Sequence, residues 1–85
     1  MTKPVRLYAH ARSYRNRRDF TAPEVKEAIR TAPSIPAERG KLNCRKNFEF
    51  EKTWNGTWYN TKQVRPVFVE ESDEIVVVTV YTYYF

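Results

Sequence analysis

The sequence is short of the residues that many catalytic and metal sites need. Its 85 residues include one cysteine, Cys44, and one histidine, His10. A lone cysteine forms no intramolecular disulfide, and one cysteine with one histidine is too few for a zinc site. A single histidine also excludes any catalytic dyad of two imidazoles. We therefore expect no metal and no cofactor.

Glycine and long apolar segments are scarce as well. The two glycines, Gly40 and Gly56, make no glycine-rich loop before a helix, which excludes a phosphate-binding loop of that kind. No serine stands in a nucleophile elbow. The uncharged run at residues 75–85 is too short for a transmembrane helix and is rich in threonine and tyrosine. No apolar leader follows Met1, so we expect a cytoplasmic protein with no membrane partner.

Positive charge is concentrated in the first half of the chain. Residues 1–48 hold twelve Lys or Arg against four acids, and residues 49–85 hold three against six, which gives +8 and −3. Segregated positive charge is typical of a surface that binds nucleic acid or another polyanion. An acidic protein partner would select the same charge. A set of surface arginines that only aids solubility is the plainer alternative.

The last strand organises the expected fold. Residues 75–85 contain no charge, glycine or proline, and nearly all of them are β-branched or aromatic. Both alternating faces are largely apolar, so we expect a central strand that is covered on both sides. Thr79, Tyr81 and Tyr83 give one of these faces its hydroxyl groups.

Two helices are expected ahead of the long strands. Residues 9–18 are predicted to form a short helix after a candidate strand at residues 5–8. Thr21 and Glu24 make the capping-box pattern of a second helix, which should end at Pro33. The apolar stripe of this second helix should pack on the sheet.

An Asn-Gly pair predicts a tight hairpin in the second half of the chain. Asn55 and Gly56 tolerate the positive φ angles of a type I′ turn, so the residues on either side should pair as antiparallel strands. That register would set Glu49 opposite Lys62, an oppositely charged pair. Pro66 on the returning strand implies a bulge or an edge.

These elements predict a single domain over residues 1–85. The expected fold class is α+β, with two N-terminal helices packed on a twisted antiparallel sheet of three to four strands. The last three strands should form a meander.

The remaining side-chain chemistry is that of arginine, lysine, tyrosine and one histidine. These groups suit metal-free cleavage of RNA, in which a base takes the 2′-hydroxyl proton, cations stabilise charge on phosphorus, and an acid protonates the leaving oxygen. We expect the catalytic groups to converge at one edge of the sheet. The expected catalytic residues are His10, Arg17, Tyr81 and Tyr83, and the expected RNA-binding residues are Arg12, Arg15, Arg18, Arg45 and Lys46.

Each of these residues also has a plainer interpretation. His10 could be a helix-start histidine that bonds to the backbone or to a neighbouring side chain. The arginine run at residues 12–18 could be a solvated helix face. Tyr81 and Tyr83 could be core or rim aromatics.

Two parts of the chain carry a resemblance to a known family. His10-Ala11 and Arg18, followed by the segment 20–25 with Ala28-Ile29, resemble the opening of a family of small uncharacterised bacterial domains, and Glu70–Tyr81 resembles its closing segment. That family is similar to the RelE and BrnT type of toxin, in which two helices pack on an antiparallel sheet. The resemblance implies a RelE-like fold, ribonuclease activity as the toxin of a toxin–antitoxin pair, and an acidic antitoxin-like protein partner.

Three functional hypotheses remain open at this point. The first is a RelE-like, metal-independent ribonuclease whose basic face binds RNA. The second is a non-catalytic module that binds nucleic acid or protein with the same face. The third and weaker one is a structural oligomeriser that uses Trp58 and the aromatic tail.

Overall fold

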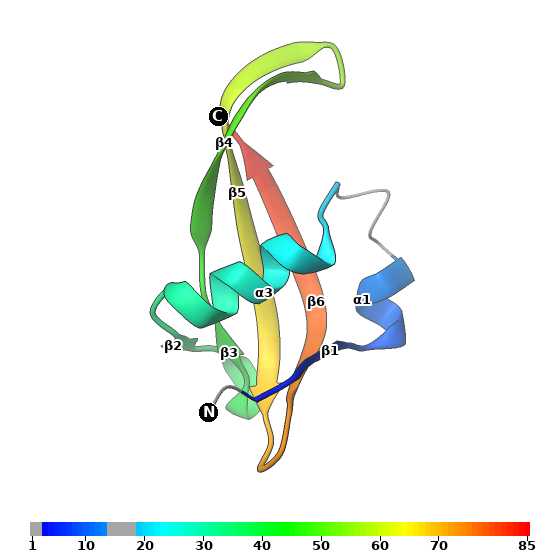
Figure 1. The fold of residues 1–85 in the computed structure, drawn as a ribbon, viewed down its shortest axis with the longest axis vertical. Coiled ribbons are helices and arrows are strands. Elements are labelled where there is room, and N and C mark those ends of the chain that lie inside the picture. The colour runs from blue at the N-terminus through cyan, green and yellow to red at the C-terminus, as the bar shows by residue number, and fades with distance from the viewer. Residues whose placement is uncertain (1–2, 14–18) are drawn as a thin grey trace.

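The fold is seen in a computed structural model, which describes residues 3–13 and 19–85 (Figure 1). These residues form one six-stranded sheet with the strand order β1-β6-β5-β3-β2, and β4 also pairs with β5. Helices α1 and α3 accompany the sheet. The elements in chain order are β1 (Val5–Leu7), α1 (Ala9–Ser13), α3 (Ala22–Thr31), β2 (Ile35–Pro36), the 3₁₀ turn η1 (Glu38–Gly40), β3 (Leu42–Asn43), β4 (Lys46–Trp54), β5 (Thr57–Glu70) and β6 (Ile75–Tyr84).

The expected fold class is wrong. Strands make up 51% of the described residues, and they form six strands of a mixed sheet rather than three or four antiparallel strands below two helices. The described helices are short, with five residues in α1 and ten in α3. The sequence pattern missed β2 and β3 because strands of two residues are too short to show an alternation. It did indicate β1, which pairs in parallel with β6.

The last strand, β6, lies inside the sheet between β1 and β5, but β5 rather than β6 is the central strand. One edge of β5 pairs with β6, and the other pairs with β4 and then with β3. Beyond β5, the other edge of β6 pairs with β1 over Ile75–Val77. Fourteen residues make β5 long enough to hold two successive partners along one edge.

The N-terminus of α3 confirms the capping-box prediction. The Thr21 hydroxyl accepts the Glu24 backbone N–H at 3.3 Å, and the Glu24 carboxylate accepts the Thr21 backbone N–H at 2.9 Å. These bonds satisfy two of the donors that a helix start leaves unpaired. The other predicted helix begins as expected in α1, and its second part, residues 14–18, lies outside the described residues.

The hairpin closes where the sequence predicts. Asn55 and Gly56 have φ angles of 51° and 82°. The expected opposition of Glu49 and Lys62 is wrong by one step, because Glu49 lies opposite Thr61 and the register shifts between Glu49 and Lys52. Glu51 lies within this bulge and has a φ of 49°. A bulge between two regular strands is invisible to a prediction that counts outward from the turn.

Pro66 lies in the middle of β5, and of the two predicted alternatives it is the bulge that is found, as a register shift between Val67 and Phe68. The Pro66 carbonyl accepts the backbone N–H of Cys44 at 3.3 Å. In an antiparallel strand, the N–H and the C=O of one residue point to the same neighbouring strand. The N–H that proline lacks would therefore point to the same edge of β5 as the Pro66 carbonyl. The neighbouring edge is interrupted there, since β3 ends at Asn43 and β4 starts at Lys46.

The hydrophobic core lies between the helices and one face of the sheet. The helices contribute Ala11, Val25 and Ala28, and Phe20 precedes α3. The same cluster includes Val64 and Phe68 of β5, Val77 and Val80 of β6, Leu7 of β1, and Cys44. The other face of β5 and β6, which we call the open face, carries Gln63, Arg65, Val67, Tyr81 and Tyr83, because these positions alternate with the core residues.

A buried lysine ties the sheet to the start of α3. Lys62 is only 4% exposed, and its ammonium lies 3.0 Å from the Glu24 carboxylate and 3.8 Å from that of Asp19. The Tyr84 hydroxyl donates to the same Asp19 at 2.9 Å. Burial raises the pKa of Tyr84, and the hydrogen bond to Asp19 raises it further. These contacts link Lys62 of β5 and Tyr84 of β6 to the loop before α3 and to the first turn of α3.

Candidate nucleic-acid interface

A row of exposed aromatic rings runs along the open face. Tyr81, Tyr83 and Phe85 are 38%, 43% and 58% exposed. They occupy alternate positions of one strand, with Phe85 held by two backbone hydrogen bonds to Thr61. Side chains at such positions point to the same face and stand about 6.6 Å apart. Aromatic rings presented in this way on a sheet can stack with the bases of a single strand.

Polar side chains lie beside this row on the neighbouring strands. Arg65 is opposite Tyr81 and Gln63 is opposite Tyr83. The Gln63 amide donates to the side chain of Asn47 on β4 at 3.0 Å. The β3 and β4 pairings share one register, which places Arg45 beside Arg65. A line of residues across the sheet therefore holds a phenol and two guanidinium groups.

The Arg65 guanidinium is held in a defined orientation. Its Nε donates to the Asn43 side-chain oxygen at 3.3 Å, and its Cζ lies 5.6 Å from the centre of the Tyr81 ring. Asn43 is 6% exposed and donates its own amide to the Ile35 carbonyl at 3.3 Å. No hydrogen bond from the two terminal nitrogens of Arg65 is found within residues 3–13 and 19–85. Those two nitrogens form the fork that binds phosphate oxygens.

The expected catalytic residues lie on different elements. His10 is exposed on α1, and its carbonyl accepts the Ser13 hydroxyl at 2.6 Å. Tyr81 and Tyr83 lie on the open face, whereas Ala11 of α1 packs in the core on the other face of the sheet. Arg17 lies outside the described residues. The convergence of His10 with these tyrosines stays a prediction.

The expected RNA-binding residues also separate. Lys46 donates to the Thr31 hydroxyl at 2.8 Å and lies 3.5 Å from Glu27, so it is engaged with α3. Arg45, one residue earlier, is exposed and lies on the open face by alternation. Arg12 is exposed on α1 and lines a small pocket with Tyr8, Ala22 and Lys26. The other two expected residues, Arg15 and Arg18, lie outside the described residues.

Sequence analysis missed Arg65 and the cations of the 35–43 segment. Arg65 lies in the half of the chain that is acidic overall, so the comparison of charge between the two halves does not single it out. The period-two pattern around Arg65 was visible, but its place opposite Tyr81 depends on the β5–β6 register. That register includes a bulge next to Pro66, and a proline that predicts a bulge or an edge does not say which residues of β6 the strand pairs with.

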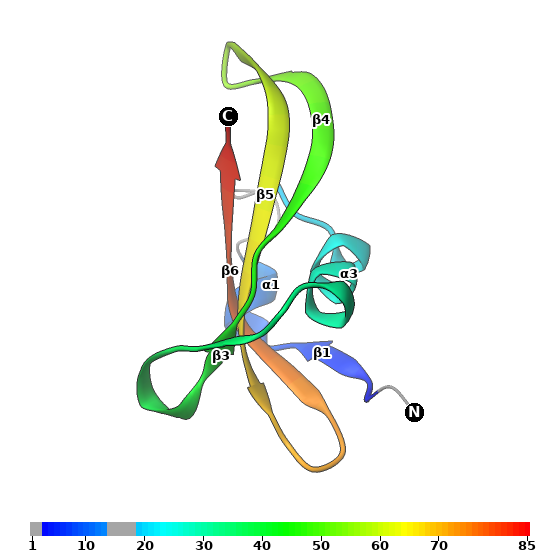
Figure 2. The same cartoon turned by 90° about the vertical axis from the view of Figure 1, so that its left-hand side faces the viewer.

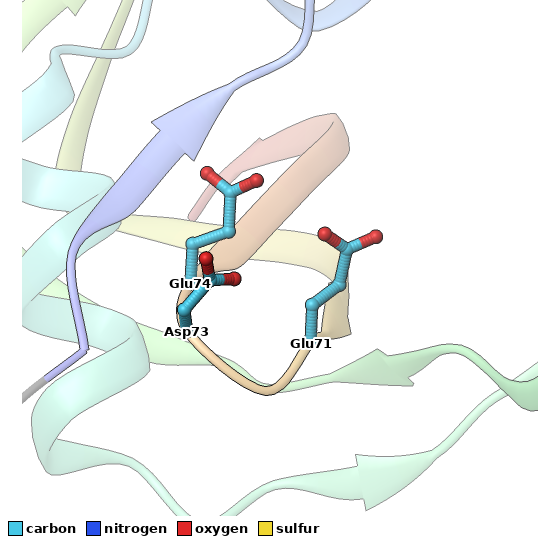
Figure 3. Close-up of side chains that lie close together, drawn as sticks. All are labelled: Glu71, Asp73 and Glu74. Atoms are coloured by element: carbon cyan, nitrogen blue, oxygen red, sulfur yellow. The ribbon is translucent and has the colours of Figure 1, made fainter.

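Three carboxylates gather in the turn between β5 and β6 (Figure 3). One carboxylate oxygen from each of Glu71, Asp73 and Glu74 lies within 4.8 Å of the other two. Arg6 donates to both oxygens of Glu74 at 3.1 and 3.2 Å, and these bonds hold the pKa of Glu74 below its usual value. Lys3 donates to the Glu71 carbonyl at 2.8 Å. These bonds hold the acidic turn against β1 and neutralise part of its charge.

Comparisons of the chain with protein-family models, with curated proteins and with solved structures give no match. None of the helices within the described ranges is long and apolar enough to cross a membrane.

Proposed function

We propose that this chain binds single-stranded RNA across the open face of its sheet. The observation that carries the proposal is the row of exposed rings at Tyr81, Tyr83 and Phe85 beside the oriented guanidinium of Arg65. The rings supply stacking, which tolerates any base sequence, and the cations supply phosphate contacts. The amides of Gln63 and Asn47 lie in the next row and can bond to ribose hydroxyls.

Fluorescence anisotropy with an eight-nucleotide RNA tests this proposal. The Tyr83→Leu variant should bind about 5- to 150-fold more weakly, since one stacked base contributes about 1–3 kcal/mol. Tyr8→Leu is the matched control, because Tyr8 is 52% exposed and lies in a pocket with Lys26 of α3. Equal losses in both variants, or no binding by the unaltered protein, would refute the proposal.

Salt dependence separates phosphate contacts from stacking. With Arg65 and Arg45 each contacting a phosphate, the slope of log K against log salt should be about −1.4, at about −0.7 per contact. Arg65→Gln should reduce the magnitude of the slope by about 0.7, and Tyr83→Leu should leave it unchanged. A DNA strand of the same sequence tests whether the ribose hydroxyls matter, a preference that rests on the resemblance to the toxin family.

Ribonuclease activity is the second candidate function. It is favoured by the phenol of Tyr81 beside the guanidinium of Arg65. In such a reaction the 2′-oxygen forms a bond to phosphorus while the bond to the 5′-oxygen breaks. A base accepts the 2′-hydroxyl proton, an acid such as Tyr81 gives its proton to the 5′-oxygen, and Arg65 stabilises the phosphorane charge. His10 stays the predicted base.

An RNA-degradation assay separates cleavage from binding. If the tyrosine is the acid and the histidine the base, Tyr81→Phe and His10→Ala should each lower the rate about 10²- to 10⁴-fold. Full binding with no cleavage by the unaltered protein would leave the non-catalytic module as the function. Growth arrest with RNA fragmentation on expression would favour the toxin hypothesis. An acidic protein partner, the other occupant expected for this face, would then compete with RNA.

A further inference from the structure

One end of the open face is bounded by a projecting loop. Residues 35–43, which we call the arm, comprise β2, η1 and β3. The arm projects from the side of the sheet opposite α3 (Figure 2). Backbone bonds from Ala37 to Lys41 at 2.9 Å and from Lys41 to Glu38 at 3.2 Å close it into a compact turn. Pairing of Leu42 and Asn43 with β5 fixes the arm to the sheet.

A groove of about 610 Å³ lies between the arm and the open face. This volume is within the range of about 300–1,000 Å³ that is typical of small-ligand sites. Val67 and Thr79 of the sheet line it, together with the last ring of the aromatic row, Tyr81. A strand stacked along Phe85, Tyr83 and Tyr81 would therefore reach the groove and meet the arm.

The charge of the groove exceeds what an internal phosphodiester needs. Arg39 and Lys41 of the arm and Arg65 of the sheet all line it, and among the described residues Glu38 is the one acid that does so. The balance is two positive charges. An internal phosphodiester carries one negative charge, whereas a terminal phosphomonoester carries about 1.5 to 2 near neutral pH. The buried Asn43 holds the Arg65 fork in place beside this groove.

We propose that the arm groove binds the terminal phosphomonoester of an RNA strand whose preceding bases stack on the aromatic row. The proposal rests on the proposed function and places one end of the bound strand at the groove. The shared chemistry is a doubly charged phosphate on a nucleotide, at either the 5′ or the 3′ end. Arg65 binds it in a bidentate manner, and Arg39 and Lys41 supply the additional charge.

Three forms of one eight-nucleotide RNA test the proposal, with an internal fluorescent label and either two hydroxyl ends, a 5′-phosphate or a 3′-phosphate. One phosphorylated form should bind about 10-fold more tightly than the hydroxyl form, because it gains charge-assisted bonds to the groove. Which form does so identifies the end. Arg39→Asn and Lys41→Gln should remove this gain and change binding of the hydroxyl form less than about 2-fold.

The variants are chosen to leave the fold intact. Arg39 has a φ of 57°, a left-handed conformation that asparagine tolerates well, and its side chain is exposed. Arg30→Gln is the matched control, since Arg30 is an exposed arginine on α3. It should leave the gain unchanged, and thermal unfolding checks that all three variants fold.

The outcomes separate the two proposals. Equal affinity for the three RNA forms overturns the groove proposal and leaves RNA binding by the open face standing. A gain that survives Arg39→Asn and Lys41→Gln places the phosphate elsewhere and also overturns it. Failure of every RNA form to bind refutes the proposed function and the groove proposal with it.

Discussion

Replacing Lys62 by methionine tests the contact between the sheet and α3. The substitution keeps most of the side-chain volume and removes one buried ammonium. It leaves the carboxylates of Glu24 and Asp19 without the charge that faces them at 3.0 and 3.8 Å. Hydrogen bonds to charged groups contribute about 1.5–3 kcal/mol, and one such bond is lost here. We expect the free energy of unfolding to fall by about 2–3 kcal/mol.

Urea unfolding followed by tryptophan fluorescence measures this change. Lys46→Met is the matched control, because Lys46 also pairs with a carboxylate of α3, at 3.5 Å, but is more exposed. A pair of that kind contributes less than about 1 kcal/mol.

A double-mutant cycle with Glu24→Gln isolates the pair, since glutamine keeps the capping box. The double variant should lose less stability than the two single variants together. A loss below about 0.5 kcal/mol for Lys62→Met, or strict additivity in the cycle, would refute the reasoning.

Three further predictions concern other parts of the fold. Burial raises the pKa of the Cys44 thiol from 9.0 to about 11, so its reaction with a thiol reagent at pH 8 should be about 100-fold slower than in urea. The hydrogen bond from Arg6 lowers the pKa of Glu74, so its contribution to stability is present above the unfolded value and is lost as the pH falls. The difference in melting temperature between Arg6→Gln and the unaltered protein should therefore shrink between about pH 6 and pH 3; a constant difference would contradict it. Gly56→Ala should destabilise the hairpin by about 1 kcal/mol in thermal unfolding, because its φ is 82°, whereas Asn55→Gly should cost less.

The features that can be predicted from the sequence alone are local. The start of α3 depends on Thr21 and Glu24, which are three residues apart. The hairpin turn depends on the neighbours Asn55 and Gly56. Both patterns fix the backbone through contacts within one turn of chain, so the residue types alone are enough to predict them. The aromatic and β-branched residues of β6 also predict a long strand, because these residue types fit a pleated surface.

Which strand is central, and which side chains lie on each face of the sheet, depends on contacts between segments that are distant in the chain. Lys62 donates to Glu24, which is 38 residues away in the chain. Glu49 does not lie opposite Lys62, because a bulge shifts the register of the hairpin. Bulges shift register without a marked sequence signal, and each shift changes the partners of every residue beyond it.

The candidate site depends on the same long-range choices. Arg65 meets Tyr81 through the β5–β6 register and Asn43 through the pairing with the arm. Neither pairing can be read from a window of neighbouring residues. The tyrosines and arginines can be recognised in the sequence, but the face on which they lie cannot. Because α3 packs on one face of the sheet and buries it, the tyrosines and arginines of the other face stay exposed.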